Sequence, residues 1–114
     1  DYECEQAPQK IKSETLQLKL KKTTDIARTI GETKGEKKLV IFAAETQNCE
    51  QNARSKLKAK NADLVVANDV TKSGAGFDVD TNIATLITDG SVDRLDIMTK
   101  TELADRILDK ISEL

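Results

Sequence analysis

The sequence lacks histidine and tryptophan, and it holds only two cysteines, one proline, one tyrosine and two phenylalanines in 114 residues. Without histidine, no histidine-based acid–base catalysis is available, and Cys4 and Cys49 form no C-x-x-C motif. A zinc site is therefore excluded. We interpret both cysteines as reduced thiols rather than a disulfide, which predicts a cytoplasmic protein.

The chain also lacks a long apolar run. A bilayer-spanning helix needs about 20 apolar residues, and the first residues show no basic region followed by an apolar stretch. The balance of 18 basic and 20 acidic residues gives a net charge of −2, without the basic excess of nucleic-acid-binding proteins. We therefore predict neither a membrane nor a nucleic-acid partner. The length suits one small domain, and because the chain does not begin with Met, we expect a segment of a longer protein.

The centre of the chain is typical of a parallel α/β sheet. Residues 39–44 form a continuous apolar run, which predicts a strand covered on both faces, and residues 63–67 form another. Between them, residues 47–60 predict an amphipathic helix whose inner stripe is Ala53 and Leu57. Strand, helix and strand in this order predict a right-handed crossover of a parallel sheet.

The residues before this unit give weaker signals. We interpret residues 1–14 as a loop or flap, and the alternation of residues 15–20 predicts a half-buried strand. Thr24 and Asp25 then supply the start, and Gly31 the end, of a short helix over residues 25–30.

The residues after the unit predict a hairpin and a helix. A loop over residues 71–81 precedes two short strands, 83–88 and 92–97, joined at a turn. Thr99 and Glu102 form the pattern of a capping box at the start of the last helix. Met98 and Leu103 occupy hydrophobic-staple positions. The expected apolar stripe of this helix is Leu103, Ile107, Leu108, Ile111 and Leu114.

Two lysines stand out on the central helix. Lys56 and Lys60 are four residues apart, beside the inner stripe, and we expect both to reach the crevice at the carboxyl ends of the strands. Two ammonium groups there suit a polyphosphate. Lysines at this spacing are otherwise most often a solvated face of a helix.

Three residues are expected at the ends of the buried strands. Phe42 is as readily a core side chain as a ligand contact. Asn68 and Asp69 are candidates for the same crevice, although ending a strand and capping the next loop is the commoner role of such residues. Lys10 and Lys12 form a short basic stretch of the kind that is usually solvated, and no P-loop motif is present.

These signals occur in the order of one known family. The landmarks are D-Y, K-I-K, D-I-A, F-A-A-E-T, A-R-x-K-L-x-x-K, A-D-L-V-V-A-N-D-V, G-A-G-F, D-T-N and the closing T-K-T-E-L-A-D-R-I-L-D-K-I. In this order the chain resembles phosphopantothenoylcysteine synthetase, the ligase half of the bacterial coenzyme A bifunctional protein. The resemblance covers essentially all 114 residues.

The resemblance implies part of a Rossmann-like three-layer α/β domain, with residues 1–114 as its C-terminal portion. Residues 1–14 would be a flap, residues 15–36 a strand and short helix with a role in dimerisation, and residues 37–114 the α/β core. The implied partners are the missing N-terminal half of the domain and a second copy in a homodimer.

The implied activity is the ligation of 4′-phosphopantothenate to cysteine. CTP activates the pantothenate carboxylate as an acyl-cytidylate, with Mg²⁺ as the expected ion, and the cysteine amine then displaces CMP. FMN would be a cofactor only if a decarboxylase domain precedes this region. The alternative is a non-catalytic fragment that binds nucleotide or serves dimerisation.

The resemblance also implies a set of nucleotide-site residues. Lys10 would be the catalytic residue, acting on the reacting phosphate from the flap. Asp1 and Phe42 would lie near the sugar and base, and Lys56 and Lys60 would hold the phosphates. The full implied set is Asp1, Lys10, Thr24, Asp25, Ile26, Ala27, Phe42, Lys56 and Lys60.

The chain departs from the family pattern at three points. Ser13 stands where the family usually has a third lysine, and Thr24 where it usually has proline. The asparagine that handles the acyl-cytidylate belongs to the missing half. No residue of this chain is therefore assigned to the intermediate, and a metal site is left unassigned.

Overall fold

The computed structural model describes residues 1–75 and 78–114. Gly76 and Phe77, which belong to the G-A-G-F landmark and to the predicted 71–81 loop, lie outside the described residues. The elements are β1 (Tyr2–Cys4), β2 (Leu20–Lys22), α1 (Ile26–Thr33), β3 (Val40–Glu45), α2 (Cys49–Ala59), β4 (Leu64–Asp69), β5 (Thr81–Asn82), β6 (Ala84–Ile87), β7 (Val92–Arg94), β8 (Met98–Thr99) and α3 (Lys100–Ser112).

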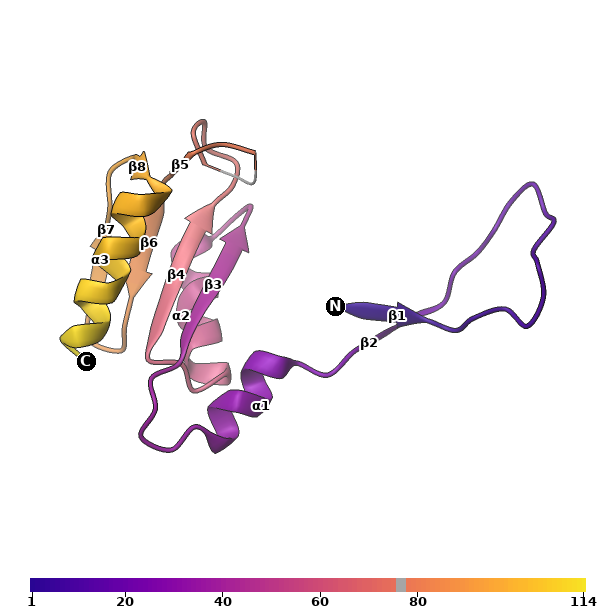
Figure 1. The fold of residues 1–114 in the computed structure, drawn as a ribbon, viewed down its shortest axis with the longest axis horizontal. Coiled ribbons are helices and arrows are strands. Elements are labelled where there is room, and N and C mark those ends of the chain that lie inside the picture. Colours follow the sequence, from indigo (N-terminus) through magenta and orange to yellow (C-terminus); the bar gives the residue numbers. More distant parts are fainter. Residues whose placement is uncertain (76–77) are drawn as a thin grey trace.

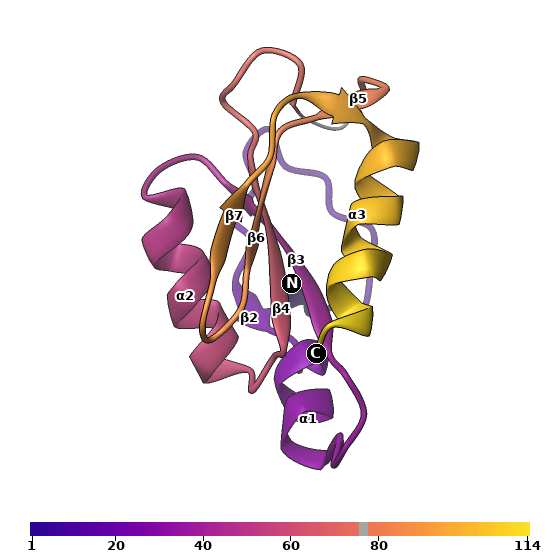
Figure 2. The ribbon, with the colours of Figure 1, turned by 90° about the vertical axis from the view of Figure 1, so that its left-hand side faces the viewer.

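The main sheet has the strand order β3-β4-β6-β7. Strands β3 and β4 are parallel, and the two other pairs are antiparallel. Helix α2 lies on one face of the sheet and α3 on the other (Figure 2). The predicted α/β class, its three layers, the strand–helix–strand unit and the C-terminal hairpin are thus confirmed. Strands β5 and β8 form a separate two-stranded pair beside the start of α3.

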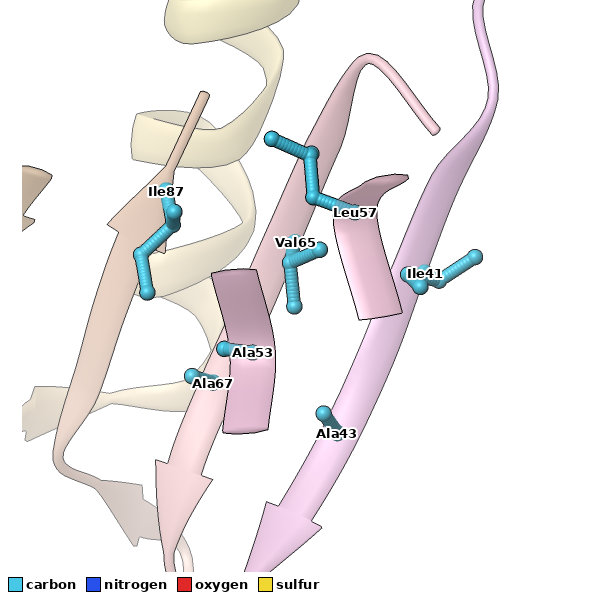
Figure 3. Close-up of a cluster of buried hydrophobic side chains, with 7 residues drawn as sticks. All are labelled: Ile41, Ala43, Ala53, Leu57, Val65, Ala67 and Ile87. Carbon is cyan, nitrogen blue, oxygen red and sulfur yellow. The ribbon is translucent and has the colours of Figure 1, made fainter. Parts of the chain in front are cut away.

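The face of the sheet under α2 holds the first part of the core (Figure 3). Ala53 and Leu57 are buried against Ile41, Val65 and Ile87 from three neighbouring strands. Because α2 offers only these two buried residues, the sheet supplies most of the apolar surface. The predicted inner stripe of α2 is confirmed.

The face under α3 holds the second part. Leu103 and Ile107 are buried with apolar residues of β4 and β6. The Thr99 hydroxyl accepts a hydrogen bond from the Glu102 N–H at 3.2 Å, and the Thr99 N–H donates to the Glu102 carboxylate at 2.8 Å, so the predicted capping box is confirmed. The predicted stripe was wrong for Leu108, which is 63% exposed because it is turned about 100° from Ile107. It was also wrong for Leu114, which is exposed and lies beyond the end of α3 at Ser112.

Strand β3 forms one edge of the sheet. We predicted a strand covered on both faces, and within this chain that was wrong, because burial alternates along β3. Ile41 and Ala43 face α2, whereas the side chain of Phe42 is 71% exposed. The residues that α3 buries come mainly from β4 and β6, so Phe42 stays uncovered by residues 1–75 and 78–114.

The first 22 residues form an arm that projects away from the sheet (Figure 1). Its only strands are the antiparallel pair β1 and β2, so a loop over all of residues 1–14 and a strand over residues 15–20 were both wrong. The leucines of the alternating segment, Leu16, Leu18 and Leu20, are all exposed. None of the three is buried by the described part of the chain, and strand pairing with β1 begins only at Leu20.

Helix α1 joins the arm to the sheet. Asp25 is its N-cap, as predicted, but the helix continues through Gly31 to Thr33, so the predicted end at Gly31 was wrong. A Cβ at Gly31 would lie 1.8 Å from the Lys60 carbonyl oxygen. Glycine is therefore present for the close approach of α1 to the end of α2, and it does not end the helix.

Candidate functional site

A pocket of about 410 Å³ lies between the base of the arm, the start of α1 and the end of α2. Its lining residues are Asp1, Tyr2, Lys22, Thr23, Thr24, Asp25, Ile26, Ala27 and Lys60. Residues from three distant parts of the sequence therefore meet here. Of the residues implied by the resemblance, the pocket brings together Asp1, the turn over residues 24–27 and Lys60.

Backbone contacts hold the arm side of this pocket. The Thr23 N–H donates to the Asp1 carbonyl at 3.1 Å, and Tyr2 pairs with Lys22 across the two short strands. Sequence reasoning missed Tyr2, Lys22 and Thr23 as lining residues. The signal that would have found them is the pairing of β1 with β2, which is not visible in the local pattern of a short polar segment.

Asp25 anchors the α1 side. Its Oδ1 accepts a hydrogen bond from the Arg28 N–H at 3.1 Å, and its Oδ2 lies 3.3 Å from the Lys60 Nζ. The backbone hydrogen bond from Arg28, followed by the interaction with Lys60, holds the pKa of Asp25 below its usual value. Asp25 is therefore ionised at neutral pH, beside the backbone N–H groups at the start of α1.

Lys60 is placed by the contact between the two helices. The Asn61 side chain donates from Nδ2 to the Gly31 carbonyl at 2.9 Å, and Asn61 has a left-handed φ of 49°. Together with the close approach at Gly31, this bond fixes the end of α2 against α1. The ammonium of Lys60 consequently faces Asp25 and the pocket.

The pocket combines donors and acceptors. The ammonium groups of Lys22 and Lys60 and the free backbone N–H groups at the start of α1 suit an anion such as a phosphate. The carboxylates of Asp1 and Asp25 can accept hydrogen bonds from hydroxyl or amino groups. A ligand with phosphates at one end and a polyhydroxylated part at the other matches this arrangement.

Lys56 does not line the pocket. Its Nζ is paired with the Glu45 carboxylate at the carboxyl end of β3. We predicted that Lys56 and Lys60 would reach one crevice at the carboxyl ends of the strands, and for Lys60 this was wrong. Because α2 connects two parallel strands, it runs antiparallel to them, and its C-terminal end returns to their amino ends.

Asn68 and Asp69 are at the carboxyl end of β4, as predicted. Asp69 Oδ1 accepts hydrogen bonds from the Thr71 N–H at 3.1 Å and the Thr71 hydroxyl at 2.5 Å, which lower the pKa of Asp69. Asp69 thus caps the loop that follows, the commoner of its two predicted roles. Among the described residues, the buried Oδ1 of Asn68 has no hydrogen-bond partner.

Besides Lys56, two implied residues lie apart from the pocket. Phe42 is the third residue of β3, in the middle of the strand rather than at its carboxyl end, and it is exposed on the open face. Its alternative role as a core side chain is excluded within this chain. Lys10 is exposed on the arm and does not line the pocket at the arm's base.

Neither a membrane span nor a metal cluster is found in the described part of the chain. No helix there has both the length and the apolar character to cross a bilayer. Residues 1–75 and 78–114 also hold no group of three or more acidic, cysteine or histidine side chains placed to bind a metal ion.

Comparison with known proteins identifies the family. A model of the DNA/pantothenate metabolism flavoprotein C-terminal domain matches residues 1–114. The chain belongs to this family. It is 53% identical over 98 residues to the coenzyme A biosynthesis bifunctional protein CoaBC of Bacillus subtilis, covering 85% of this chain and 24% of that protein.

Two further comparisons agree with the family. The chain is 40% identical over 99 residues to a cysteine/cysteine sulfinic acid decarboxylase from an unknown prokaryote, covering 85% of this chain and 28% of that protein. A crystal structure of the C-terminal domain of a CoaBC protein superposes with a TM-score of 0.69 at 40% identity, covering 82% of this chain and 43% of that one. The chain thus spans about a quarter of the curated relatives and less than half of the solved domain.

Proposed function

We propose that this chain forms the nucleotide-binding part of a phosphopantothenate–cysteine ligase of coenzyme A biosynthesis. The observation that carries the proposal is the pocket, which gathers Asp1, the turn over residues 24–27 and Lys60 from separate parts of the sequence. The similarity to CoaBC proteins over most of the chain supports it. The ligand would be CTP.

The proposed reaction has two steps. A carboxylate oxygen of 4′-phosphopantothenate forms a bond to the α-phosphorus of CTP while the bond to the β-phosphate oxygen breaks, releasing pyrophosphate. The amine of cysteine then attacks the acyl carbon, loses a proton, and CMP leaves with the bonding electrons. Positioning and charge neutralisation supply most of the acceleration of such a reaction.

The residues of the pocket have distinct roles in this proposal. Lys60 and Lys22 neutralise phosphate charge, together with the N–H groups at the start of α1. Lys56, one helical turn from Lys60 and outside the pocket lining, binds a further phosphate of the same nucleotide. Asp1 accepts hydrogen bonds from the sugar. Lys10, carried on the arm, acts on the reacting phosphate, and Phe42 on the open face of β3 contacts the base.

Other components complete the proposed enzyme. Mg²⁺ would bind mainly through the phosphates of CTP, since such ions commonly use one or two carboxylates plus substrate phosphates. The N-terminal half of the domain would pack beside β3 and cover the exposed Phe42. FMN would be present only in a fused decarboxylase domain, and the enzyme would be cytoplasmic.

The test is pyrophosphate release by the full-length protein in the presence of CTP, Mg²⁺, 4′-phosphopantothenate and cysteine. We expect Lys10→Gln to lower kcat about 100-fold, the magnitude of losing one charged group at a developing charge. Lys19→Gln, an exposed lysine of the same arm, is the matched control and should change kcat less than about 2-fold. Equal rates for Lys10→Gln and the control would contradict the role of Lys10.

A second candidate function is dimerisation without catalysis. The arm carries three alternating leucines, Leu16, Leu18 and Leu20, each of which is more than half exposed. A second copy of the chain would bury them. This function is compatible with the ligase, and it would stand alone if CTP did not bind.

A further inference from the structure

Glu45 is the most buried acidic residue among the described side chains, with 8% of its surface exposed. It ends β3, and its carboxylate accepts hydrogen bonds from the Lys56 Nζ and from the Asn52 Nδ2, the latter at 3.0 Å. Both donors come from α2. A buried carboxylate requires such partners, because an unpaired charge away from water is costly.

The two side chains of the Glu45–Lys56 pair differ in their exposure to solvent. The Glu45 side chain is almost fully enclosed, whereas the Lys56 side chain keeps 39% of its surface exposed. An ammonium group has three N–H donors, and pairing with a carboxylate uses one of them. Lys56 therefore has a fixed position on one side and donors open to solvent on the other.

The backbone strengthens the position of Glu45. Its carbonyl accepts a hydrogen bond from the Val70 N–H at 3.1 Å, just after β4, and Glu45 lies opposite Asp69 in the parallel register. The carboxylate thus stands on a rigid strand end, while a lysine alone would sample many rotamers. Asn52 also donates to the Gln47 carbonyl at 3.0 Å, so the second donor is itself held in place.

From this geometry we infer that Glu45 is a positioning residue, which fixes the ammonium of Lys56 for a phosphate of the bound nucleotide. The inference rests on the proposed function, since it assigns Glu45 a role through Lys56. It adds a residue to the site that does not touch the nucleotide and that the spacing of the lysines did not indicate.

The test is a double-mutant cycle in the full-length protein with CTP as the varied substrate. Glu45→Gln preserves volume but removes the charge, and we expect it to raise the KM for CTP about 3- to 10-fold with kcat changed less than about 2-fold. In a Lys56→Ala background, the same substitution should change KM less than about 2-fold. A purely structural role would give equal effects in both backgrounds and would overturn the inference.

The matched control is Glu50→Gln, a substitution on α2, the helix that carries Lys56. Glu50 pairs with Arg94 at 2.5 Å and with Arg54 at 3.6 Å, and it makes no contact with Lys56. We expect its KM for CTP to stay within about 2-fold of the wild type. If Glu50→Gln raises the KM for CTP as much as Glu45→Gln does, the rise comes from the loss of a negative charge in general, and the positioning role of Glu45 is contradicted.

A second variant covers the case in which Glu45→Gln does not fold. Asn52→Ala removes one of the two donors to Glu45 at a less buried position, and it should raise KM about 2- to 3-fold only when Lys56 is present. The single Lys56→Ala variant separates the two claims. If Lys56→Ala leaves the KM for CTP unchanged, the phosphate role of Lys56 in the proposed function is contradicted. If Lys56→Ala raises this KM while Glu45→Gln and Asn52→Ala do not, only the positioning role of Glu45 is contradicted.

Discussion

Single residues decide where the charges of the pocket lie. Lys60 follows the last residue of α2 and would be free to turn into solvent, but the bond from Asn61 to the Gly31 carbonyl holds this end of the helix against α1. Asp25 then receives the Lys60 ammonium at 3.3 Å. The pocket therefore depends on a glycine and an asparagine that do not line it.

Gly31→Ala tests this dependence. The new Cβ would lie 1.8 Å from the Lys60 carbonyl oxygen and 2.8 Å from its carbon, both backbone atoms that cannot move without shifting a helix. We expect a loss of about 1–3 kcal/mol in the free energy of unfolding, measured by urea denaturation.

Gly90→Ala is the control, because a Cβ there meets nothing within 4 Å. It should change the free energy of unfolding by less than about 0.5 kcal/mol. Equal stability of Gly31→Ala and Gly90→Ala would show that the approach of α1 to α2 is not as close as described.

Side-chain roles were predictable from sequence where they are local. The capping box of Thr99 and Glu102 follows from a spacing of three residues, and Asp25 was recognised as a helix start for the same reason. The pairing of Lys56 with Glu45 was not predictable, because it depends on how far along β3 the helix packs. The spacing of apolar residues shows which side of a helix faces the sheet, but it does not show where along the strands the helix packs.

At the scale of elements, one half-buried carboxylate ties three segments together. Asp63 Oδ2 accepts hydrogen bonds from the Leu39 N–H and the Lys34 Nζ, each at 2.7 Å, just before β4. Lys38 adds a longer interaction at 3.8 Å. This group joins the end of α1, the start of β3 and the start of β4, and so fixes α1 and its pocket relative to the sheet.

The pH dependence of stability should report this connection. Burial raises the pKa of Asp63, but the hydrogen bonds from Lys34 and Leu39 outweigh it, so the pKa in the folded chain lies below the usual 3.8. A lowered pKa contributes stability that is present above pH 3.8 and is lost as the pH falls through the folded value.

We therefore expect Asp63→Asn to lower the free energy of unfolding by about 1–3 kcal/mol at pH 7, and by less as the pH falls below about 4. Thermal unfolding of both proteins across this range measures the difference. Glu3→Gln, which removes an exposed pair with Lys21 at 3.1 Å, is the control and should cost less than about 1 kcal/mol. A difference independent of pH would contradict the role of the Asp63 charge.

The elements themselves were largely predictable, and the failures over residues 15–20 and on β3 have a common cause. Strands β4 and β6 and helix α2 pack within this chain, so their apolar patterns match their burial, as does the part of the α3 stripe formed by Leu103 and Ile107. The segment over residues 15–20 and the open face of β3 have apolar patterns that the described part of the chain leaves exposed. The apolar pattern of a segment indicates which of its side chains are buried in the complete protein. It does not indicate which other segment or chain packs against them.

At the scale of the whole molecule, the arm and the edge of β3 are the two incomplete surfaces. The arm extends from α1 away from the sheet (Figure 1). Its leucines and Phe42 of β3 are all more than half exposed. Exposed alternating apolar segments are a liability unless a partner covers them. We propose that a second copy covers the arm and that the N-terminal half of the domain covers β3.

Self-association should therefore depend on the arm. We expect the full-length protein to sediment as a dimer, and Leu16→Asp with Leu18→Asp to shift it toward monomer by placing charges in an apolar interface. Analytical ultracentrifugation measures the shift. Leu108→Asp, at an exposed leucine of α3, is the control and should leave the mass unchanged; a dimer that survives the arm substitutions would locate the interface elsewhere.

The most direct test of the account is the affinity of the full-length protein for CTP, measured by calorimetry with Lys60→Ala and Lys58→Ala. Lys60 lines the pocket and Lys58 is exposed on the same helix without an ion pair among the described residues. We predict that Lys60→Ala raises the Kd for CTP about 10-fold, or about 1.4 kcal/mol, and that Lys58→Ala binds CTP as the wild type does. Added salt should weaken the affinity of the wild type. Equal affinities for the two variants, or no binding of CTP by the wild type, would contradict the assignment of this pocket to the nucleotide.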